Sequence, residues 1–439
     1  MSMEILNALN GAACACGKKH SFSAELCIGS GVISRIPNYI RQYNAQKVFI
    51  LSDTNTYAAA GKQVCDILSE SCIPFTSYSF THFPVDPDEY SVGAAFMHFD
   101  PACDFIIGVG SGVINDIGKI LSCHCGKPYM IVATAPSMDG YASATSSMTR
   151  DGLKISLPSR SADIILGDID ILRQAPLHMM KSGLGDMLAK YVSICEWRIA
   201  HLITDEYYCE EVAGLIRSAL QKCIAHADDL LKRDPEAVQA VFEGLVIGGV
   251  AMNYAGLSRP ASGVEHYISH ILDMRSVEFG TPMDLHGIQC AIGTVIAVRL
   301  YERLKTTQPD RNKALSYVAR FDYNAWRHTL QTLLGKSADS MIALEEKEKK
   351  YDKATHKVRL ERIINNWDAI LQIIDEELPD AKDLEALLSS IDCPKSLDAI
   401  GIEPTLLPVI FAATKDIRDK YVLSRLAWDL GILDEITKQ

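Results

Sequence analysis

Short apolar runs alternate with helical patterns over the first 172 residues, and this alternation restricts the possible folds more than any other feature. Four runs are typical of buried strands, at 47–52, 75–80, 104–108 and 129–133. Strands separated by helical crossovers pair in parallel, because each crossover returns the chain to the same end of the sheet. The pattern therefore predicts an α/β, Rossmann-like nucleotide-binding domain over residues 1–172.

Long amphipathic segments replace this alternation after residue 172. Apolar residues recur there with the period of a helix, most clearly at 186–201, 205–231, 235–254 and 287–305. We therefore expect an all-α C-terminal domain over 173–439, with the functional site in the cleft between the two domains.

A run of charged residues at 345–353 lies inside this second half. Such runs are usually solvated faces of helices, so we interpret it in that way rather than as a binding patch. The surrounding region, 330–400, contains no motif that points to chemistry. We predict only helical packing for it.

The composition of the chain excludes several kinds of partner. Its 439 residues carry a net charge of −12 without a concentrated basic run, which argues against nucleic acid. No stretch reaches the roughly 20 apolar residues of a membrane-spanning helix, and the first residues lack a basic leader. The 13 cysteines are an odd number in a chain without an export signal, so we expect reduced thiols and a cytoplasmic protein.

Three glycines follow the third predicted strand directly. Gly108, Gly110 and Gly112 would let the backbone approach a phosphate closely, and the helix that begins there would offer unpaired N–H groups. The spacing differs from the usual G-x-G-x-x-G, so a tight structural turn is an equal alternative. Asp53 ends another strand, where it could bind the ribose hydroxyls of adenosine or cap the next helix.

Histidines and one aspartate form the second chemical signal. His266 and His270 are four residues apart and would share one helix face. His286 follows later, and Asp186 is expected to begin a helix. Imidazole and carboxylate ligands that leave a coordination position open suit a metal ion acting as a Lewis acid. The alternative is that these histidines are core or capping residues.

Taken together and in order, the motifs resemble one family. They are GVGSGVINDIGK (108–119), TAPSMDG (134–140), GDMLAK (185–190), SRPASGVEH (258–266) and LHG (285–287). The chain resembles the glycerol-1-phosphate dehydrogenases, within the superfamily of iron-containing alcohol dehydrogenases, glycerol dehydrogenases and dehydroquinate synthases. The resemblance covers about residues 20–300, and 418–431 is similar to the bacterial branch. It implies a dehydroquinate synthase-like fold.

The resemblance also implies roles for individual residues. The implied ligands of one zinc or nickel ion are Asp186, His266 and His286. Substrate contacts are implied for Asp139, Asp186 and His270, of which Asp186 and His270 are the expected catalytic residues. The expected NAD(H)- or NADP(H)-binding residues are Asp53, Gly110, Gly112, Val113, Ile114, Asn115, Asp116, Thr134, Ser137 and Ser143.

The reaction implied by this resemblance is the reversible reduction of dihydroxyacetone phosphate to sn-glycerol 1-phosphate, by a homodimer. A glycerol dehydrogenase acting on unphosphorylated polyols is the main alternative, and a non-catalytic cofactor-binding homologue is a third. A dehydroquinate synthase would need more basic residues near the metal. Lys154, Lys190 and Arg259 are the basic residues nearest the motifs, each either a phosphate ligand or a structural ion-pair partner.

The segment Cys14-Ala-Cys16-Gly-Lys-Lys-His20 falls largely outside the resemblance. Two thiols and one imidazole are ligands of the kind that zinc prefers, but they are one short of a closed structural site. The alternative is an N-terminal segment that simply carries reduced thiols. Removal of the first 20 residues, followed by a metal assay, separates these two interpretations.

Overall fold

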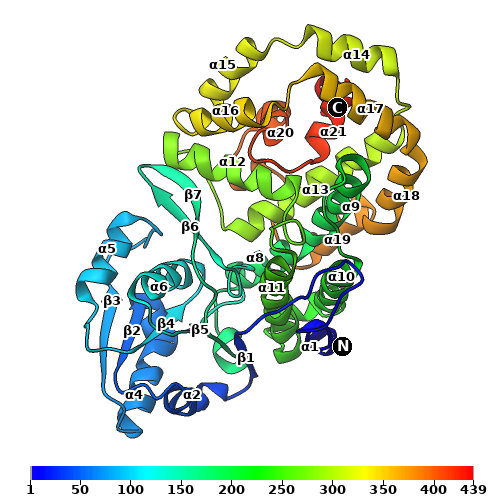
Figure 1. Cartoon of the computed structure of the whole chain (residues 1–439). Helices are drawn as coiled ribbons and strands as arrows, with labels where there is room; N and C mark the ends of the chain where they lie inside the picture. The colour runs from blue at the N-terminus through cyan, green and yellow to red at the C-terminus, as the bar shows by residue number, and fades with distance from the viewer. Residues whose placement is uncertain (1, 439) are drawn as a thin grey trace. The chain divides into compact units, whose positions relative to one another are not determined.

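A parallel six-stranded sheet organises the N-terminal part of the computed structural model, which describes residues 2–438 (Figure 1). The order of the strands is β1-β8-β5-β4-β2-β3. Their bounds are Glu25–Gly29 (β1), Val48–Asp53 (β2), Phe75–Phe80 (β3), Phe105–Gly110 (β4), Tyr129–Ala133 (β5) and Ile164–Asp168 (β8). The four predicted strands correspond to β2 through β5, whereas β1 and β8 were not predicted.

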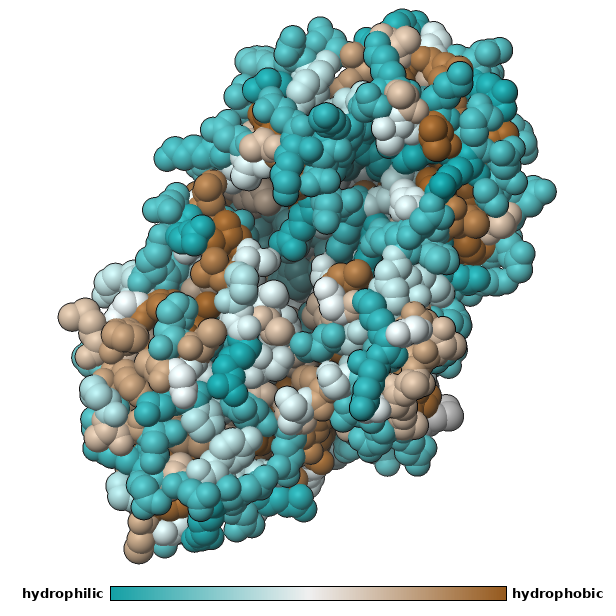
Figure 2. All heavy atoms as spheres, viewed as in Figure 1, coloured by the Kyte–Doolittle hydropathy of each residue, from teal (hydrophilic) through white to brown (hydrophobic). Residues whose placement is uncertain are grey.

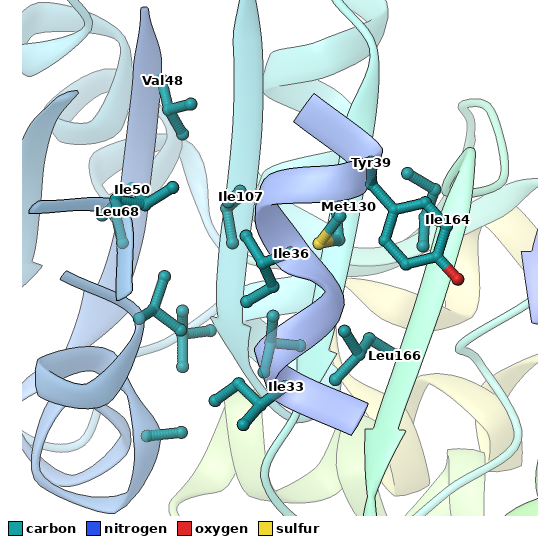
Figure 3. Close-up of a cluster of buried hydrophobic side chains, with 14 of the residues drawn as sticks. Ile33, Ile36, Tyr39, Val48, Ile50, Leu68, Ile107, Met130, Ile164 and Leu166 are labelled. Atoms are coloured by element: carbon teal, nitrogen blue, oxygen red, sulfur yellow. The ribbon is translucent and has the colours of Figure 1, made fainter. Parts of the chain in front are cut away.

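The central strands are buried on both faces, which explains their continuous apolar sequences. Every residue of β4, β5 and β8 is buried. Helices cover the sheet, and Figure 3 shows Ile36 of α2 (Ile36–Gln42) packed against Ile107 and Met130 of two neighbouring strands. The core of the α/β region therefore lies between helix and sheet.

The other helices within residues 2–188 mostly alternate with these strands. They are α1 (Ser2–Leu9), η1 (Val32–Arg35), α3 (Thr54–Thr56), η2 (Tyr57–Gly61), α4 (Lys62–Glu70), α5 (Glu89–His98), α6 (Gly112–Cys125), α7 (Ile169–Leu172) and α8 (Leu177–Leu188). A short antiparallel pair, β6 (Thr145–Arg150) and β7 (Leu153–Pro158), lies outside the main sheet. Asp151 and Gly152 connect these two strands with positive φ angles of 53° and 75°, as a tight hairpin turn requires.

The chain is divided into two compact units, each made of separate segments. Unit 1 contains residues 1–187 and 214–256, and unit 2 contains 188–213 and 257–439. Unit 1 thus extends past the predicted boundary at residue 172. The division into functional domains at 1–172 and 173–439 stays a prediction.

The second segment of unit 1 adds most of α10 (Glu210–Ala225), then η3 (Ala227–Lys232) and α11 (Pro235–Ala255). α11 packs closely in this unit, because a Cβ atom at Gly249 would lie 2.9 Å from the carbonyl oxygen of Asp139. By length and composition α11 could cross a membrane, but 83% of its most apolar window is buried within the protein. Core helices share both properties.

The described residues of unit 2 form helices joined by loops, without a strand. Its helices are α9 (Lys190–Thr204), α12 (Val264–Phe279), α13 (His286–Lys305), α14 (Arg311–Arg320), α15 (Tyr323–Leu334), α16 (Ser337–Glu348), α17 (Lys353–Asn365), α18 (Trp367–Glu377), α19 (Ala381–Ser390), η4 (Asp398–Ile400), η5 (Pro404–Leu406), α20 (Leu407–Thr414), α21 (Leu423–Asp429) and α22 (Leu433–Ile436). The predicted fold class, an α/β region followed by a helical one, is confirmed.

The charged run at 345–353 is not a uniformly solvated face, so this expectation was wrong for its first residue. The Glu345 side chain is fully buried and forms ion pairs with Lys350 at 2.8 Å and Arg425 at 3.6 Å. Its neighbour Glu346 has a side chain that is 55% exposed. Tertiary partners far along the chain decide this difference, and a local charge pattern does not contain them.

Apolar side chains also remain on the surface of unit 1. Figure 2 shows mostly hydrophilic residues, with apolar ones gathered over α5. The exposed residues there are Tyr90, Phe96 and Met97, and Phe83 of the preceding loop is 79% exposed.

Candidate metal and dinucleotide sites

Three histidines come together at the starts of two adjacent helices in unit 2. His266 lies in the first turn of α12 and His270 lies one turn later, as the spacing predicts. His286 is the first residue of α13. The ring centroids of His266 and His286 are 5.0 Å apart, and those of His270 and His286 are 6.0 Å apart. The structure therefore groups the predicted imidazoles.

Hydrogen bonds to side chains outside the histidine group orient two of these rings. The Nδ1 atom of His266 lies 2.8 Å from the Oε1 atom of Glu265, so Nδ1–H donates to this carboxylate. The Nδ1 atom of His286 lies 3.1 Å from the hydroxyl oxygen of Ser269. Metal-binding histidines commonly use one ring nitrogen in this way and present the other to the metal. Nε2 is thus the nitrogen suited to metal binding in both residues.

A cysteine that the sequence analysis missed belongs to the same group. The Sγ atom of Cys290 lies 3.6 Å from Nε2 of His286, and the ligand atoms of His266, His286 and Cys290 all lie within 4.8 Å of one another. Burial raises the pKa of the Cys290 thiol, but the two imidazoles lower it, and the net shift is downward. The i, i+4 spacing from His286 was the signal that could have identified Cys290.

The prediction that Asp186 begins a helix was wrong, because α8 already begins at Leu177 and Asp186 lies near its end. The Asp186 side chain is completely buried. Its Oδ2 atom accepts a hydrogen bond from the backbone N–H of Asp139 at 2.9 Å. α8 can approach this loop because residue 183 is glycine: a Cβ atom there would collide with the carbonyl oxygen of Pro136. The hydroxyl of Ser182 also donates to the carbonyl of Ser137 at 2.9 Å. The two predicted substrate-binding aspartates are therefore held together.

The three glycines of the β4–α6 turn have different surroundings. A Cβ atom at Gly108 would collide with the Tyr129 hydroxyl, and one at Gly110 would lie 2.5 Å from Cβ of Ile114. These two positions require glycine for packing inside the protein. At Gly112 the nearest atom would be Cγ of Met138, at 3.4 Å, which is an ordinary contact. Gly112 is thus the glycine whose absent side chain leaves space beside the start of α6.

The residues after Gly112 mostly support this turn. Ile114 and Asn115 are buried, and the Asn115 amide donates to the carbonyl of Gly140 at 3.1 Å. Asp116 forms an ion pair with Lys119 at 2.9 Å. Val113, in the first turn of α6, is half-buried. These residues shape the turn between β4 and α6.

Hydroxyl groups line the neighbouring loop. The Oγ atoms of Ser111 and Ser137 are 2.5 Å apart, and Ser143 is hydrogen-bonded to Thr145 at 3.0 Å. Thr134 follows β5 directly, and its N–H donates to the carbonyl of Gly110 at 3.0 Å. The structure thus places these predicted cofactor-binding residues in one region of unit 1.

Asp53 is an N-cap residue, which was one of its two predicted roles. Its Oδ1 atom accepts from the backbone N–H groups of Asn55 and Thr56, both at 2.8 Å, and Thr56 completes a capping box. This geometry fixes the carboxylate at the end of β2. Oδ2 is the oxygen suited to a ribose hydroxyl.

The predicted basic residues have structural partners. Arg259 is buried and binds both oxygens of Glu206 at 2.6 Å, so it forms the ion pair that was its alternative role. Lys190 is also buried and donates to the carbonyl of Ala261 at 3.1 Å. Lys154 lies on β7 and is half-buried. Arg259 is therefore removed from the candidates for phosphate binding.

Comparisons with known proteins agree with this arrangement. Residues 27–176 match the model of a family described as iron-containing alcohol dehydrogenase. A glycerol-1-phosphate dehydrogenase [NAD(P)+] from Halalkalibacterium halodurans is 34% identical over 66% of this chain and 74% of its own length. The chain belongs to the glycerol-1-phosphate dehydrogenase family. Another member, from Geobacillus stearothermophilus, is 28% identical over 90% of each chain.

Solved structures support the fold assigned to this family member. The structure of glycerol dehydrogenase from Schizosaccharomyces pombe matches over 96% of this chain and 91% of its own chain, with a TM-score of 0.60 and 16% sequence identity. NADH-dependent butanol dehydrogenase A from Thermotoga maritima covers 95% and 98%, with a TM-score of 0.59 and 15% identity. At these identities the likeness shows the fold alone.

Proposed function

We propose that this protein catalyses the reversible, NAD(P)H-dependent reduction of dihydroxyacetone phosphate to sn-glycerol 1-phosphate. The observation that carries the proposal is the oriented pair His266 and His286, with Nδ1 of each bonded to an outer group. The choice of substrate and cofactor follows the names of its relatives, glycerol-1-phosphate dehydrogenase [NAD(P)+].

We propose that Asp186, His266 and His286 would hold one divalent metal ion. Two imidazoles and a carboxylate fit zinc or nickel, and a glutamate and a serine orient the rings as outer groups of such sites do. When bound, the metal would polarise the ketone of the substrate and the nicotinamide would supply the hydride.

The protein's own residues position the substrate and handle the proton. Asp139, held through its N–H by Asp186, would orient a terminal hydroxyl of the substrate. His270 faces the same histidine group and would deliver the proton that the substrate oxygen gains when hydride reaches carbon 2. Hydride and proton together convert the ketone to the alcohol.

Dinucleotide binding is assigned to unit 1. The start of α6 would hold the pyrophosphate, since Gly112 leaves space there and the helix N-terminus favours negative charge. Asp53, Thr134 and Ser137 would contribute polar contacts. We propose that either NADH or NADPH serves.

We further propose that the enzyme acts in the cytoplasm as a homodimer. The apolar side chains exposed over α5 form a surface that association would cover. Sedimentation velocity of the purified protein tests the assembly, and a purely monomeric species at micromolar concentration would reject it.

The decisive experiment follows NADH oxidation by protein that has been stripped with a chelator and resupplied with nickel or zinc. We expect strong preference for dihydroxyacetone phosphate over dihydroxyacetone, and loss of turnover in His286→Ala. His124→Ala, on an exposed histidine at the end of α6, is the matched control and should keep its activity. Preference for dihydroxyacetone would make the protein a glycerol dehydrogenase. Absence of metal-dependent turnover with either substrate would reject the proposal.

A further inference from the structure

The N-terminal loop that carries Cys14, Cys16 and His20 has a defined backbone. The N–H of Cys14 donates to the carbonyl of Lys18, and the N–H of Gly17 donates to the carbonyl of Cys14, both at 3.0 Å. Gly17 has a φ of 83°, which favours glycine at this turn. The loop is therefore a tight turn, and it brings the three side chains to one place.

The ligand atoms of Cys14, Cys16 and His20 lie within 4.8 Å of one another. The Sγ atom of Cys16 is 3.5 Å from Nε2 of His20. None of the 13 cysteines within residues 2–438 forms a disulfide. Two thiols and an imidazole at this separation are soft and borderline donors, which favour zinc over magnesium or calcium.

His20 is oriented as a metal ligand would be. The side chain is 1% exposed, and its Nδ1 atom lies 3.0 Å from the carbonyl oxygen of Tyr254 at the end of α11. A carbonyl oxygen only accepts, so Nδ1 carries the proton and Nε2 presents its lone pair toward Cys16. A backbone carbonyl that fixes the tautomer in this way is a common outer partner of zinc-bound histidine.

The same loop is attached to α11 by further contacts within unit 1. Lys18 donates to the carbonyl of Ala255 at 3.0 Å, and the Tyr254 hydroxyl donates to the carbonyl of Leu6 at 3.3 Å. A metal ion here would hold this turn closed and so preserve its contacts with α11. Its role would be structural, because it would stabilise the attachment of the N-terminal segment.

We propose that Cys14, Cys16 and His20 bind a structural zinc ion separate from the dehydrogenase metal. None of these residues belongs to the proposed catalytic or cofactor-binding sets. The inference is therefore independent of the proposed reaction.

The test is metal content per chain, measured on full-length protein purified with zinc and passed through a desalting column. Wild type should hold about two zinc ions per chain, and the Cys14→Ser/Cys16→Ser variant about one. Cys123→Ser removes an exposed thiol elsewhere and should leave the content unchanged. Equal zinc content in wild type and the Cys14→Ser/Cys16→Ser variant would overturn the proposal.

A second measurement keeps the test valid if that variant folds poorly. Cobalt is loaded into His286→Ala/Cys290→Ser, which lacks one proposed ligand of the dehydrogenase site and the thiol beside it. The N-terminal site should still give a tetrahedral cobalt spectrum with a thiolate charge-transfer band. Absence of this band, or a Cys14–Cys16 disulfide found by mass spectrometry in place of metal, would contradict the proposal.

Discussion

Glu265 shows how one residue can direct the chemistry of its neighbour. It precedes His266 in the sequence, and its carboxylate also accepts from the N–H of Gly263 at 2.7 Å. The helix N-terminus thus fixes the carboxylate, and the carboxylate fixes the imidazole. The motif identifies His266, but the amino-acid sequence does not show which ring nitrogen faces inward.

Glu265→Gln should therefore weaken metal binding without removing a ligand. We expect an affinity roughly 10- to 100-fold lower, because the histidine loses its charged partner. Competition with a chromophoric chelator measures this change. Glu346→Gln, at an exposed site, is the control and should bind metal like wild type. Equal affinities for wild type and Glu265→Gln would contradict the role of Glu265.

Two glycines of the β4–α6 turn give a matched pair of tests. Gly112→Ala should preserve stability, because its Cβ atom would make only ordinary contacts. It should raise the Kd for NADH by about tenfold or more, because the methyl group would occupy the proposed phosphate position. Gly110→Ala should instead lose about 1–3 kcal/mol of unfolding free energy, since Ile114 must move. Urea unfolding and NADH fluorescence titration separate the two effects. Unchanged NADH binding in Gly112→Ala would exclude this turn as the phosphate site.

At the scale of elements, the sequence predicted those strands that form continuous apolar or aromatic runs. β2, β4 and β5 are such runs and are buried almost throughout, whereas β3 is a partly buried edge strand rich in aromatic residues. β1 was missed because most of its residues are not buried, and β8 because it follows a hairpin instead of a long helix. The hairpin turn at Asp151-Gly152 was a local signal that the sequence analysis did not use.

Helix α16 carries a prediction about pH. Burial, followed by the charge of Asp416, raises the pKa of Glu345 to about 7, compared with 4.5 for an ordinary glutamate. The folded protein therefore keeps a proton that the unfolded chain releases. The stabilising contribution is complete below about pH 4.5 and is lost as the pH rises through about 7, by on the order of a few kcal/mol.

Glu345→Gln should remove this dependence on pH. Urea unfolding between about pH 5 and pH 8 should show a flatter change in unfolding free energy than for wild type. Glu346→Gln, on the adjacent exposed residue, should retain the wild-type slope. The same slope in all three proteins would mean that Glu345 does not titrate in this range.

At the scale of the whole molecule, the proposed functions are divided between the two units. Hydrogen exchange should record this division in protein stripped of metal. NADH should slow exchange at the start of α6, in unit 1, and zinc should slow it at the starts of α12 and α13, in unit 2. Protection of α12 and α13 by NADH in metal-free protein, with none at α6, would contradict the assignment.

Unit 1 is discontinuous in the sequence, because residues 188–213 belong to unit 2 and the chain returns to unit 1 only for Gly214–Gly256. During translation, the sheet emerges from the ribosome well before α11, which covers part of it. The nascent α/β region must therefore wait, with apolar surface exposed, until that helix has been synthesised. A stop codon after residue 187 would release a chain that chaperones bind and proteases degrade, rather than an isolated nucleotide-binding domain.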